Sequence, residues 1–236
     1  EKKMYNRDYL SNQSSQYSQE SSQVQLMSFL KATYQLFAGS LLAATAGAYV
    51  GLGIVSLLMG PMKWVLFAIE LALIFFVIPR VKHTPGVNLA VLFVFTFITG
   101  LTIAPLLAAI FAMPSGASIV GQAFLMTSIA FGGISMFAMT TKKDYSFMGK
   151  FLFIALIIVI VAGISNIFIQ SSMMQLAIAS VSALLFSAFI LFDTQNIIKG
   201  GYDSPVEAAL SLYLDFFNLF ISLLQILGIM NSGDRE

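Results

Sequence analysis

The chain is a succession of long apolar segments separated by short polar ones, and this pattern predicts membrane-spanning helices. A helix needs about 20 apolar residues to cross the hydrocarbon core of a bilayer. By this criterion we expect seven spans, at residues 30–56, 64–79, 87–112, 117–140, 151–170, 174–197 and 207–229. The pattern therefore predicts an all-α, polytopic membrane protein whose seven-helix bundle occupies residues 28–230.

The last of these spans carries a stripe of polar residues. Ser211, Asp215, Asn218, Ser222 and Gln225 follow one another in steps of four, three, four and three residues. Side chains at these spacings share one face of a helix. We therefore expect the last span to face lipid on most sides, and a protein or water interior along the stripe.

The two ends of the chain are polar. Residues 1–27, and above all the Ser-, Gln-, Tyr- and Glu-rich stretch from Ser11 to Gln25, have too few apolar side chains to bury a core. We expect residues 1–27 to form a disordered cytoplasmic tail and residues 231–236 to form a short C-terminal tail.

Composition narrows the class of protein further. Of the 236 residues, 58% are hydrophobic and only 10% are charged, whereas soluble domains contain about 25% charged residues. The lipid bilayer is therefore the expected partner, and the net charge of +1 gives no reason to expect nucleic acid. The absence of cysteine excludes disulfides, thiolate catalysis and Cys-ligated metals. The single histidine, His83, lies in a short basic loop, so a Ser-His-Asp triad inside the membrane has no base.

The distribution of basic residues predicts the orientation, because cytoplasmic loops of membrane proteins are enriched in Lys and Arg. Ten of the twelve basic residues fall on one side of the expected spans, and only Lys63 and Arg235 fall on the other. The ten are Lys2, Lys3, Arg7, Lys31, Arg80, Lys82, Lys142, Lys143, Lys150 and Lys199. We expect a cytoplasmic N-terminus, an outside C-terminus and, for a bacterial protein, a place in the inner membrane.

Three acidic residues lie well inside apolar spans: Glu70, Asp193 and Asp215. An ionised Asp at the middle of a span costs about 2.5–3.5 kcal/mol, so a partner is expected. Asp193 lies near the cytoplasmic end of the sixth span and Asp215 lies about two turns into the seventh, which runs back from the same face. Two carboxyls in contact cannot both ionise at low cost, so the pair would share one proton. Once deprotonated, the pair offers the hard oxygen ligands that calcium prefers. The residues thus suggest a proton-sensitive cation site at Asp193 and Asp215; the alternative is that each Asp caps a helix or meets a lysine at the membrane edge.

The other polar residues of the spans have two interpretations each. Arg80 ends the second span on the cytoplasmic side, where it can bridge to the aspartates or simply anchor the helix in the interface. Glu70 is either a second carboxylate of an ion pathway or a protonated contact between helices. Ser211, Asn218 and Ser222 are likewise pathway residues or packing residues. We expect no cofactor, and calcium enters only as a transported ion.

Several segments resemble the Bax inhibitor-1 family. Ala209–Gly228, ALSLYLDFFNLFISLLQILG, is similar to its C-terminal signature, and Ile190–Ile198, ILFDTQNII, is similar to the preceding motif. Lys142–Phe147, KKDYSF, and Gly163–Phe168, GISNIF, are similar to its middle part. The resemblance runs from about residue 28 to residue 230.

The resemblance implies a seven-helix fold and, as in the bacterial YetJ-like members, a pH-sensitive calcium leak. In those members two aspartates on the sixth and seventh helices form the pH sensor, and an arginine at the end of the second span contacts it. These roles fall on Asp193, Asp215 and Arg80 of this chain. The Ile197–Gly201 ending and the turn at Ile169–Gln170 look more like the YccA branch, whose members bind and restrain the membrane protease FtsH.

Three functional hypotheses follow. The first is a calcium leak gated by the aspartate pair. The second is a regulator of FtsH, in which the protease would engage the polar tail of this chain. The third is an intramembrane aspartyl protease, in which two aspartates activate water. Such proteases place the second Asp in a Gly-x-Gly-Asp context followed by a Pro-Ala-Leu motif, whereas here Asp215 follows Leu212-Tyr213-Leu214 and no proline lies beyond Pro205. We therefore expect no enzyme.

Overall fold

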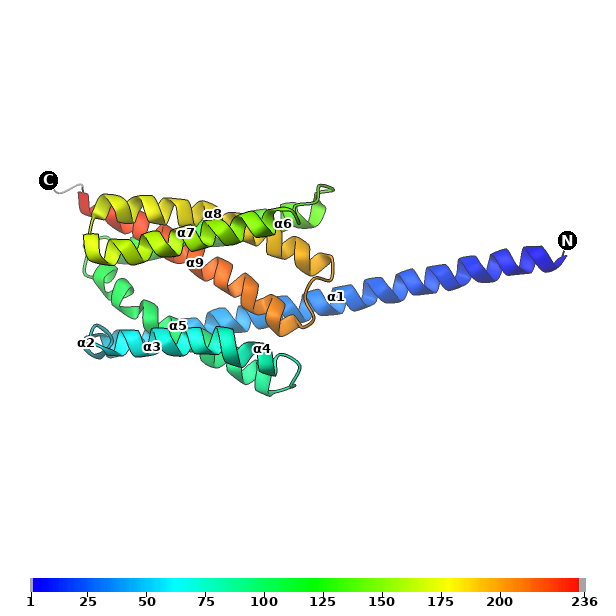
Figure 1. The fold of residues 1–236 in the computed structure, drawn as a ribbon, viewed down its shortest axis with the longest axis horizontal. Coiled ribbons are helices and arrows are strands. Elements are labelled where there is room, and N and C mark those ends of the chain that lie inside the picture. Colours follow the sequence, from blue (N-terminus) through cyan, green and yellow to red (C-terminus); the bar gives the residue numbers. More distant parts are fainter. Residues whose placement is uncertain (1, 234–236) are drawn as a thin grey trace.

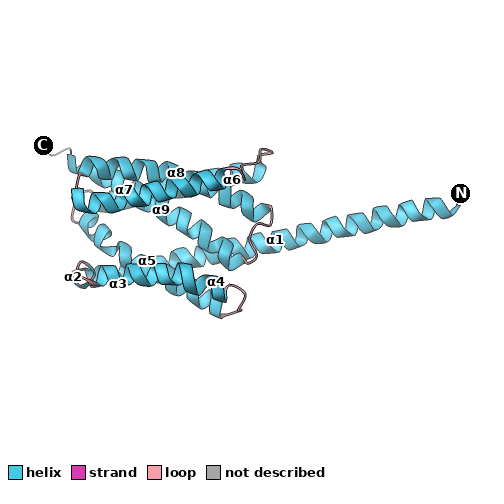
Figure 2. Ribbon diagram, in the orientation of Figure 1, coloured by secondary structure: helices cyan, strands magenta, loops and turns pink. Residues whose placement is uncertain are grey.

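A computed structural model describes residues 2–233, and for residues 2–21 it describes the backbone alone. The described residues form helices and no β-strand (Figures 1 and 2). The elements are α1 (Lys2–Gly53), α2 (Val55–Leu58), α3 (Met62–Ala72), the π-helical turn η1 (Leu73–Val77), α4 (Ile78–Val81), α5 (Val87–Phe111), α6 (Gly116–Thr140), α7 (Met148–Ile169), α8 (Ser172–Ile198) and α9 (Pro205–Gly233).

Seven segments of the described chain are long and apolar enough to cross a membrane, as the hydropathy pattern predicts. They are Ser22–Gly53, Met62–Val81, Val87–Phe111, Gly116–Thr140, Met148–Ile169, Ser172–Ile198 and Pro205–Ser232. The polytopic, all-α fold class is therefore confirmed. The loops that carry Lys82, Lys143 and Lys199 lie at the end of the bundle from which α1 projects, and the C-terminus lies at the opposite end (Figure 1).

The first helix differs from the expected disordered tail. Helix α1 runs without a break from Lys2 to Gly53, so residues 2–27 continue the first span beyond the bundle (Figure 1). Between Glu1 and Ala38 the sequence contains neither Gly nor Pro. Because extending a helix is far easier than nucleating one, the span can propagate through this polar stretch. At the other end α9 reaches Gly233, and residue 1 and residues 234–236 of the two expected tails lie outside the described residues.

The last span is the centre of the bundle, which corrects the expectation that it faces lipid on most sides. Helix α9 packs against α8, α1, α6 and α5, and in Figure 1 it lies between α6–α8 and the pair α1 and α5. Leu212, Tyr213 and Leu224 on α9 are fully buried. Small residues at Ala208 and Ala209, both fully buried, let the neighbouring helices approach closely. The spans that do face lipid are α3 and α7, whose apolar side chains are mostly exposed.

A glycine seam joins α1 to α5. A Cβ placed on Gly47 would lie 2.0 Å from the carbonyl oxygen of Phe97, and one placed on Gly100 would lie 2.0 Å from the carbonyl oxygen of Ala44. Only hydrogen fits at such distances, so the two backbones touch across this seam. The small-residue pair Gly47 and Gly51 on the first span indicates this type of close packing.

The second span is irregular near its C-terminal end, at Val81. The π-helical turn η1 separates α3 from α4, and Pro79 follows it within α4. Proline has no N–H to donate to the preceding turn, and π-turns are one way for a helix to absorb such a defect. The turn rotates the side chains beyond it relative to a regular helix, and this affects Arg80 and Lys82.

Candidate functional site

The hairpin between α8 and α9 positions the site. Helix α8 ends in a Schellman motif: the N–H of Gly201 donates to the carbonyl of Asn196 (2.8 Å), and the N–H of Gly200 donates to that of Ile197 (3.2 Å). Gly200 has a φ of 73°, a left-handed conformation that glycine adopts without strain. The hydroxyl oxygen of Ser204 then accepts from the N–H of Val206 (3.2 Å), and α9 begins at Pro205. This tight reversal places the last turns of α8 beside the first turns of α9.

Asp193 on α8 and Asp215 on α9 face each other across this hairpin. Their carboxyl groups lie within hydrogen-bonding reach of each other. Both residues are buried, with 7% of Asp193 and 4% of Asp215 exposed. Among the described residues, Oδ2 of Asp215 has no hydrogen-bond donor. Two carboxyls this close and this dry require a proton between them or a cation beside them.

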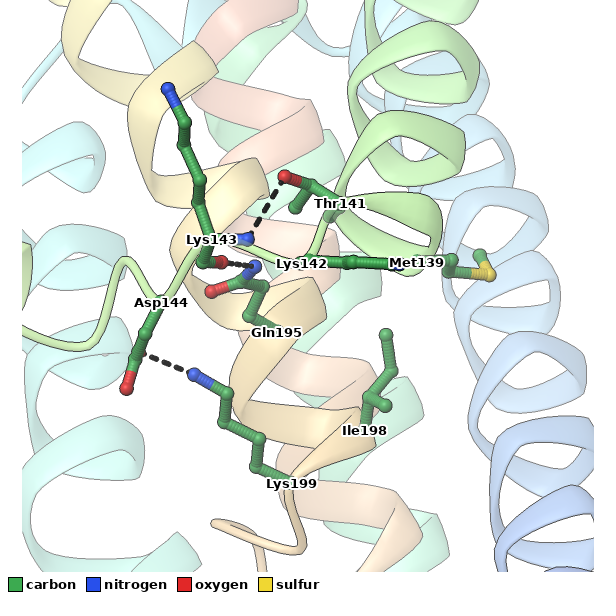
Figure 3. A pocket seen from close by; sticks show the side chains of 9 residues that line it. Met139, Thr141, Lys142, Lys143, Asp144, Gln195, Ile198 and Lys199 are labelled. Carbon is green, nitrogen blue, oxygen red and sulfur yellow. Dashed lines mark hydrogen bonds and ion pairs between the residues drawn. The ribbon is translucent and has the colours of Figure 1, made fainter.

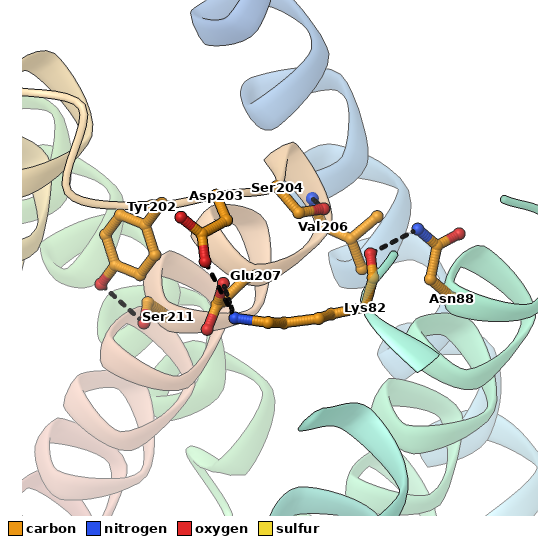
Figure 4. Close-up of polar contacts among 8 residues, drawn as sticks. All are labelled: Lys82, Asn88, Tyr202, Asp203, Ser204, Val206, Glu207 and Ser211. Carbon is orange, nitrogen blue, oxygen red and sulfur yellow. Dashed lines mark hydrogen bonds and ion pairs between the residues drawn. The ribbon is translucent and has the colours of Figure 1, made fainter. Parts of the chain in front are cut away.

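Two hydroxyl groups complete the polar lining around the aspartate pair. Tyr202 in the loop between α8 and α9 donates from its OH to Oγ of Ser211 (2.9 Å), as Figure 4 shows. Both hydroxyls also lie close to the carboxyl group of Asp193. Burial, followed by the negative charge of Asp193, raises the pKa of the Tyr202 phenol. Tyr202 therefore keeps its proton and acts as a donor beside the aspartate pair, at the end of the bundle where α8 turns into α9.

Lys82 ties the second span to this hairpin from outside. Its Nζ lies 3.1 Å from Oδ2 of Asp203 and 3.5 Å from Oε2 of Glu207 (Figure 4). Its own carbonyl accepts from Nδ2 of Asn88 at the start of α5 (3.1 Å). The hydrogen bond with Asp203 and the charge of Glu207 raise the pKa of Lys82. We call Lys82, Asp203 and Glu207 the basic clasp, because the basic side chain of Lys82 holds the end of α4 to two carboxylates of the α8–α9 hairpin.

Arg80 does not contact the aspartate pair in the part of the chain that the structure describes. Its guanidinium donates to the carbonyl of Phe76 and lies over the Phe76 ring, 6.0 Å from the centroid. The expectation that Arg80 bridges to the aspartates is therefore not met in this conformation. The reason is the π-helical turn η1, which redirects the side chains that follow it and leaves Lys82 facing the hairpin.

Glu70 lies in a second polar group, between the second span and α5. Oε1 of Glu70 accepts from Oγ1 of Thr102 on α5 (2.6 Å). One turn earlier on α5, the hydroxyl of Thr99 hydrogen-bonds to the OH of the fully buried Tyr213 on α9. These bonds join the second span to α5, and α5 to α9. Glu70 is thus bonded between helices.

The rest of the polar stripe on α9 serves different partners. Asn218 donates to the carbonyl of Leu214 (2.7 Å) and Ser222 donates to the carbonyl of Asn218 (2.7 Å), so both bond to their own helix. Gln225 accepts from Nε2 of Gln175 on α8 (2.9 Å), and Oε1 of Gln175 in turn accepts from Nδ2 of Asn166 on α7 (2.9 Å). Only Ser211 and Asp215 of the stripe belong to the aspartate site.

The loop between α6 and α7 is fastened to the end of α8, two residues beyond Asp193. Nε2 of Gln195 donates to the carbonyl of Lys143 (2.8 Å), and Oε1 of Gln195 accepts from the N–H of Tyr145 (3.0 Å). Lys199 forms an ion pair with Asp144 beside a pocket of about 170 Å³ (Figure 3). The hydrogen bond from Lys199, with help from Ser146, lowers the pKa of Asp144 well below its usual range.

The site suits a weakly held cation better than a resident metal. Among the residues that the structure describes, no group of three or more His, Cys, Asp or Glu side chains is arranged around one point. The aspartate pair, Tyr202 and Ser211 offer oxygen atoms only, which is the chemistry of a calcium ligand set. Sequence analysis found the two aspartates and Ser211 but missed Tyr202 and Lys82. Tyr202 directly follows Gly200 and Gly201, whose conformation folds the chain back towards α8. This position is the feature of the sequence that could have identified Tyr202 as a site residue.

Comparison with known proteins gives one matching family model and several similar proteins. Residues 26–232 match the family model described as "Inhibitor of apoptosis-promoting Bax1". An uncharacterized protein of Campylobacter jejuni is 50% identical over 97% of this chain and 99% of its own length, and an uncharacterized membrane protein of Vibrio cholerae is 43% identical over 87% and 91%. The modulator of FtsH protease YccA of Escherichia coli is 38% identical over 58% of this chain and 62% of its own length.

Proposed function

Since the chain belongs to the Bax inhibitor-1 family and is an integral membrane protein, we propose that it is a pH-sensitive calcium leak channel. The observation that carries the proposal is the buried contact between Asp193 and Asp215. A shared proton holds the two carboxyls together in the closed form. Removing this proton leaves two like charges in contact, which favours separation of the two carboxylates. The separated carboxylates can then bind calcium as it passes between them.

The small ligand set supports a leak rather than a storage site. Conduction requires an ion to bind well enough to enter and weakly enough to leave. With each carboxylate binding through one oxygen, the aspartate pair and the hydroxyls of Tyr202 and Ser211 supply about four of the six to eight oxygens that tightly held calcium takes, so water supplies the rest. We assign Glu70, Asn218 and Ser222 to helix contacts along the route, because each already bonds to a helix. We assign no catalytic role to any residue.

In this proposal the basic clasp takes the role that the sequence suggested for Arg80. Lys82→Met removes both ion pairs and loosens the second span, which packs mainly against α5, from the α8–α9 hairpin. We expect a several-fold higher calcium flux at pH 5–6, where the closed form dominates. The measurement is dye-reported calcium flux into liposomes. Lys63→Met is the matched control, because Lys63 begins the same span at the opposite end and should leave the flux unchanged. Equal flux in wild type and Lys82→Met would show that the basic clasp is not part of the gate.

The bias of basic residues supports a cytoplasmic N-terminus and a place in the bacterial inner membrane. Reporter domains fused after Glu236 and inserted after Lys143 should then report opposite sides of the membrane. A cytoplasmic signal from both fusions would contradict the seven-span orientation.

Regulation of a membrane protease is the second candidate function, favoured by the similarity to the modulator of FtsH protease YccA. Helix α1 projects from the bundle at the proposed cytoplasmic end, where an ATP-driven protease could engage it (Figure 1). We expect deletion of residues 1–27 to abolish any effect on substrate degradation by purified FtsH in proteoliposomes and to leave calcium flux intact. Loss of both activities would show that the deletion damages the bundle, and loss of neither would exclude the projecting helix as the contact.

A further inference from the structure

An apolar groove lies between α1 and α6 in the half of the bundle away from the projecting end of α1. Its volume is about 520 Å³, and its lining comes from α1, α5, α6 and α9. Within the described chain α1 and α6 meet at the stacked rings of Phe37 and Phe131, whose centroids lie 4.8 Å apart, and both helices pack against α9. The floor is therefore α9, at Phe216, Phe217 and Phe220, and the groove reaches the surface at the exposed side chains of Tyr49 and Phe124.

The lining chemistry excludes a polar ligand. Thr45 and Tyr49 are the only lining residues with polar side-chain atoms, and the hydroxyl of Thr45 already donates to the carbonyl of Leu41 (2.8 Å). All four lining helices are membrane spans, so the medium outside the groove is hydrocarbon rather than water. Any occupant must therefore come from the bilayer and be apolar where it touches the protein.

We propose that the groove binds one acyl chain of a membrane phospholipid. The lining on α1 runs from Leu41 to Leu52, which at 1.5 Å per residue makes the groove about 16 Å long. This elongated shape along the bilayer normal suits an extended hydrocarbon chain better than a compact ligand. The outer mouth lies at Tyr49, one turn before α1 ends at Gly53. Tyrosine favours the depth of the lipid headgroups, so Tyr49 places the lipid in the leaflet on the C-terminal side.

The bound chain would also support the central helix. Phe216 lines the groove and packs edge-to-face in an aromatic cluster, with its ring centroid 5.7 Å from that of Phe37 and 5.6 Å from that of Phe131. Filling the groove replaces missing van der Waals partners along this face of α9. Lipid binding itself does not depend on ion conduction, so the two proposals can fail separately.

Two glycines of α6 provide a matched test. A Cβ on Gly121 or on Gly133 would meet no atom within 4 Å, so both positions accept a side chain without moving the backbone. Gly121 lines the groove and Gly133 does not. Gly121→Phe should therefore fill the groove, while Gly133→Phe adds the same side chain to the same helix elsewhere.

The protein is reconstituted in phosphatidylcholine liposomes containing a trace of phosphatidylcholine with a diazirine on one acyl chain, irradiated, and mapped by peptide mass spectrometry. In wild type and in Gly133→Phe we expect labelling of Tyr49, Phe111 and Phe220 in excess over the lipid-facing Phe151 and Phe153 of α7. In Gly121→Phe this excess should be lost. Val120→Trp, a second variant that fills the groove, should lose it as well. Uniform labelling of groove and α7 residues in wild type, or an unchanged excess in Gly121→Phe, would overturn the proposal.

Discussion

Asp215→Asn is expected to abolish the pH response of calcium flux and to leave the channel closed between pH 5 and pH 8. In the proposed gate of the wild type, rising pH removes the proton shared with Asp193. Two unit charges about 4 Å apart repel by about 4 kcal/mol at an effective dielectric constant of 20. A tenfold change in population needs only about 1.4 kcal/mol, so we expect wild-type flux to rise at least about tenfold over this range. An asparagine at 215 cannot ionise and can donate to Asp193, so the contact persists at every pH.

The other charged groups at the end of the bundle from which α1 projects do not provide this response. The lowered pKa of Asp144 means that its ion pair with Lys199 stabilises the fold above the unfolded-state pKa and weakens only as pH falls through the lower, folded-state value. The raised pKa of Lys82 means that the basic clasp is fully formed below the unfolded-state pKa and is lost only as pH rises through the folded-state value. Both contributions are constant from pH 5 to pH 8.

His83 is the appropriate control for the flux experiment. It neighbours Lys82 in the loop between α4 and α5, and it is the single histidine of the chain. We expect His83→Gln to retain the wild-type pH profile. A flat pH profile of flux in His83→Gln, together with a wild-type profile in Asp215→Asn, would show that the pH sensor lies in this loop and not at the aspartate pair.

Gly100→Leu is expected to have the largest effect on stability. Any Cβ at this position overlaps the carbonyl of Ala44 on α1, so the helices must separate along the seam between α1 and α5. Overpacking of a well-packed interface costs up to about 3 kcal/mol or more, and here the obstructing atoms are backbone. Thermal unfolding in detergent should show a lower midpoint and a smaller folded fraction.

Gly132→Leu is the control for this substitution, because a Cβ at Gly132 meets no atom within 4 Å. It should change the free energy of unfolding by no more than about 0.5 kcal/mol. Similar midpoints for Gly100→Leu and Gly132→Leu would contradict the close approach of α1 and α5.

The sequence predicts the spans well because one physical quantity, the hydrocarbon thickness of the bilayer, sets their length. It also predicts that Asp193 and Asp215 meet, since a short connection makes consecutive helices antiparallel and brings equal depths together. It does not predict that α9 is central, because hydropathy distinguishes apolar from polar residues but does not distinguish a lipid neighbour from a protein neighbour. The glycine and alanine positions that decide this are informative only once partner helices are known.

Arg80 and Lys82 show a second limit of prediction from sequence, which concerns the assignment of helix faces. Helical periodicity assigns faces by counting residues, and a π-helical turn adds one residue to a turn, so every assignment beyond it shifts. The turn at Leu73–Val77 lies between Glu70 and Arg80, and Pro79 was its only sequence signal. Residues 2–27 show the converse case, because their composition suggests disorder while the lack of Gly and Pro lets the helix continue.

The most direct test of the account compares calcium flux from pH 5 to pH 8 in four proteins: wild type, Asp193→Asn, Asp215→Asn and the double variant. If the two carboxyls form one coupled unit, either single substitution removes the repulsion, and the second adds nothing. The account predicts a pH-dependent flux in wild type and the same flat profile in all three variants. A wild-type pH profile in either single variant, or pH effects of the two substitutions that add, would contradict a gate formed by Asp193 and Asp215.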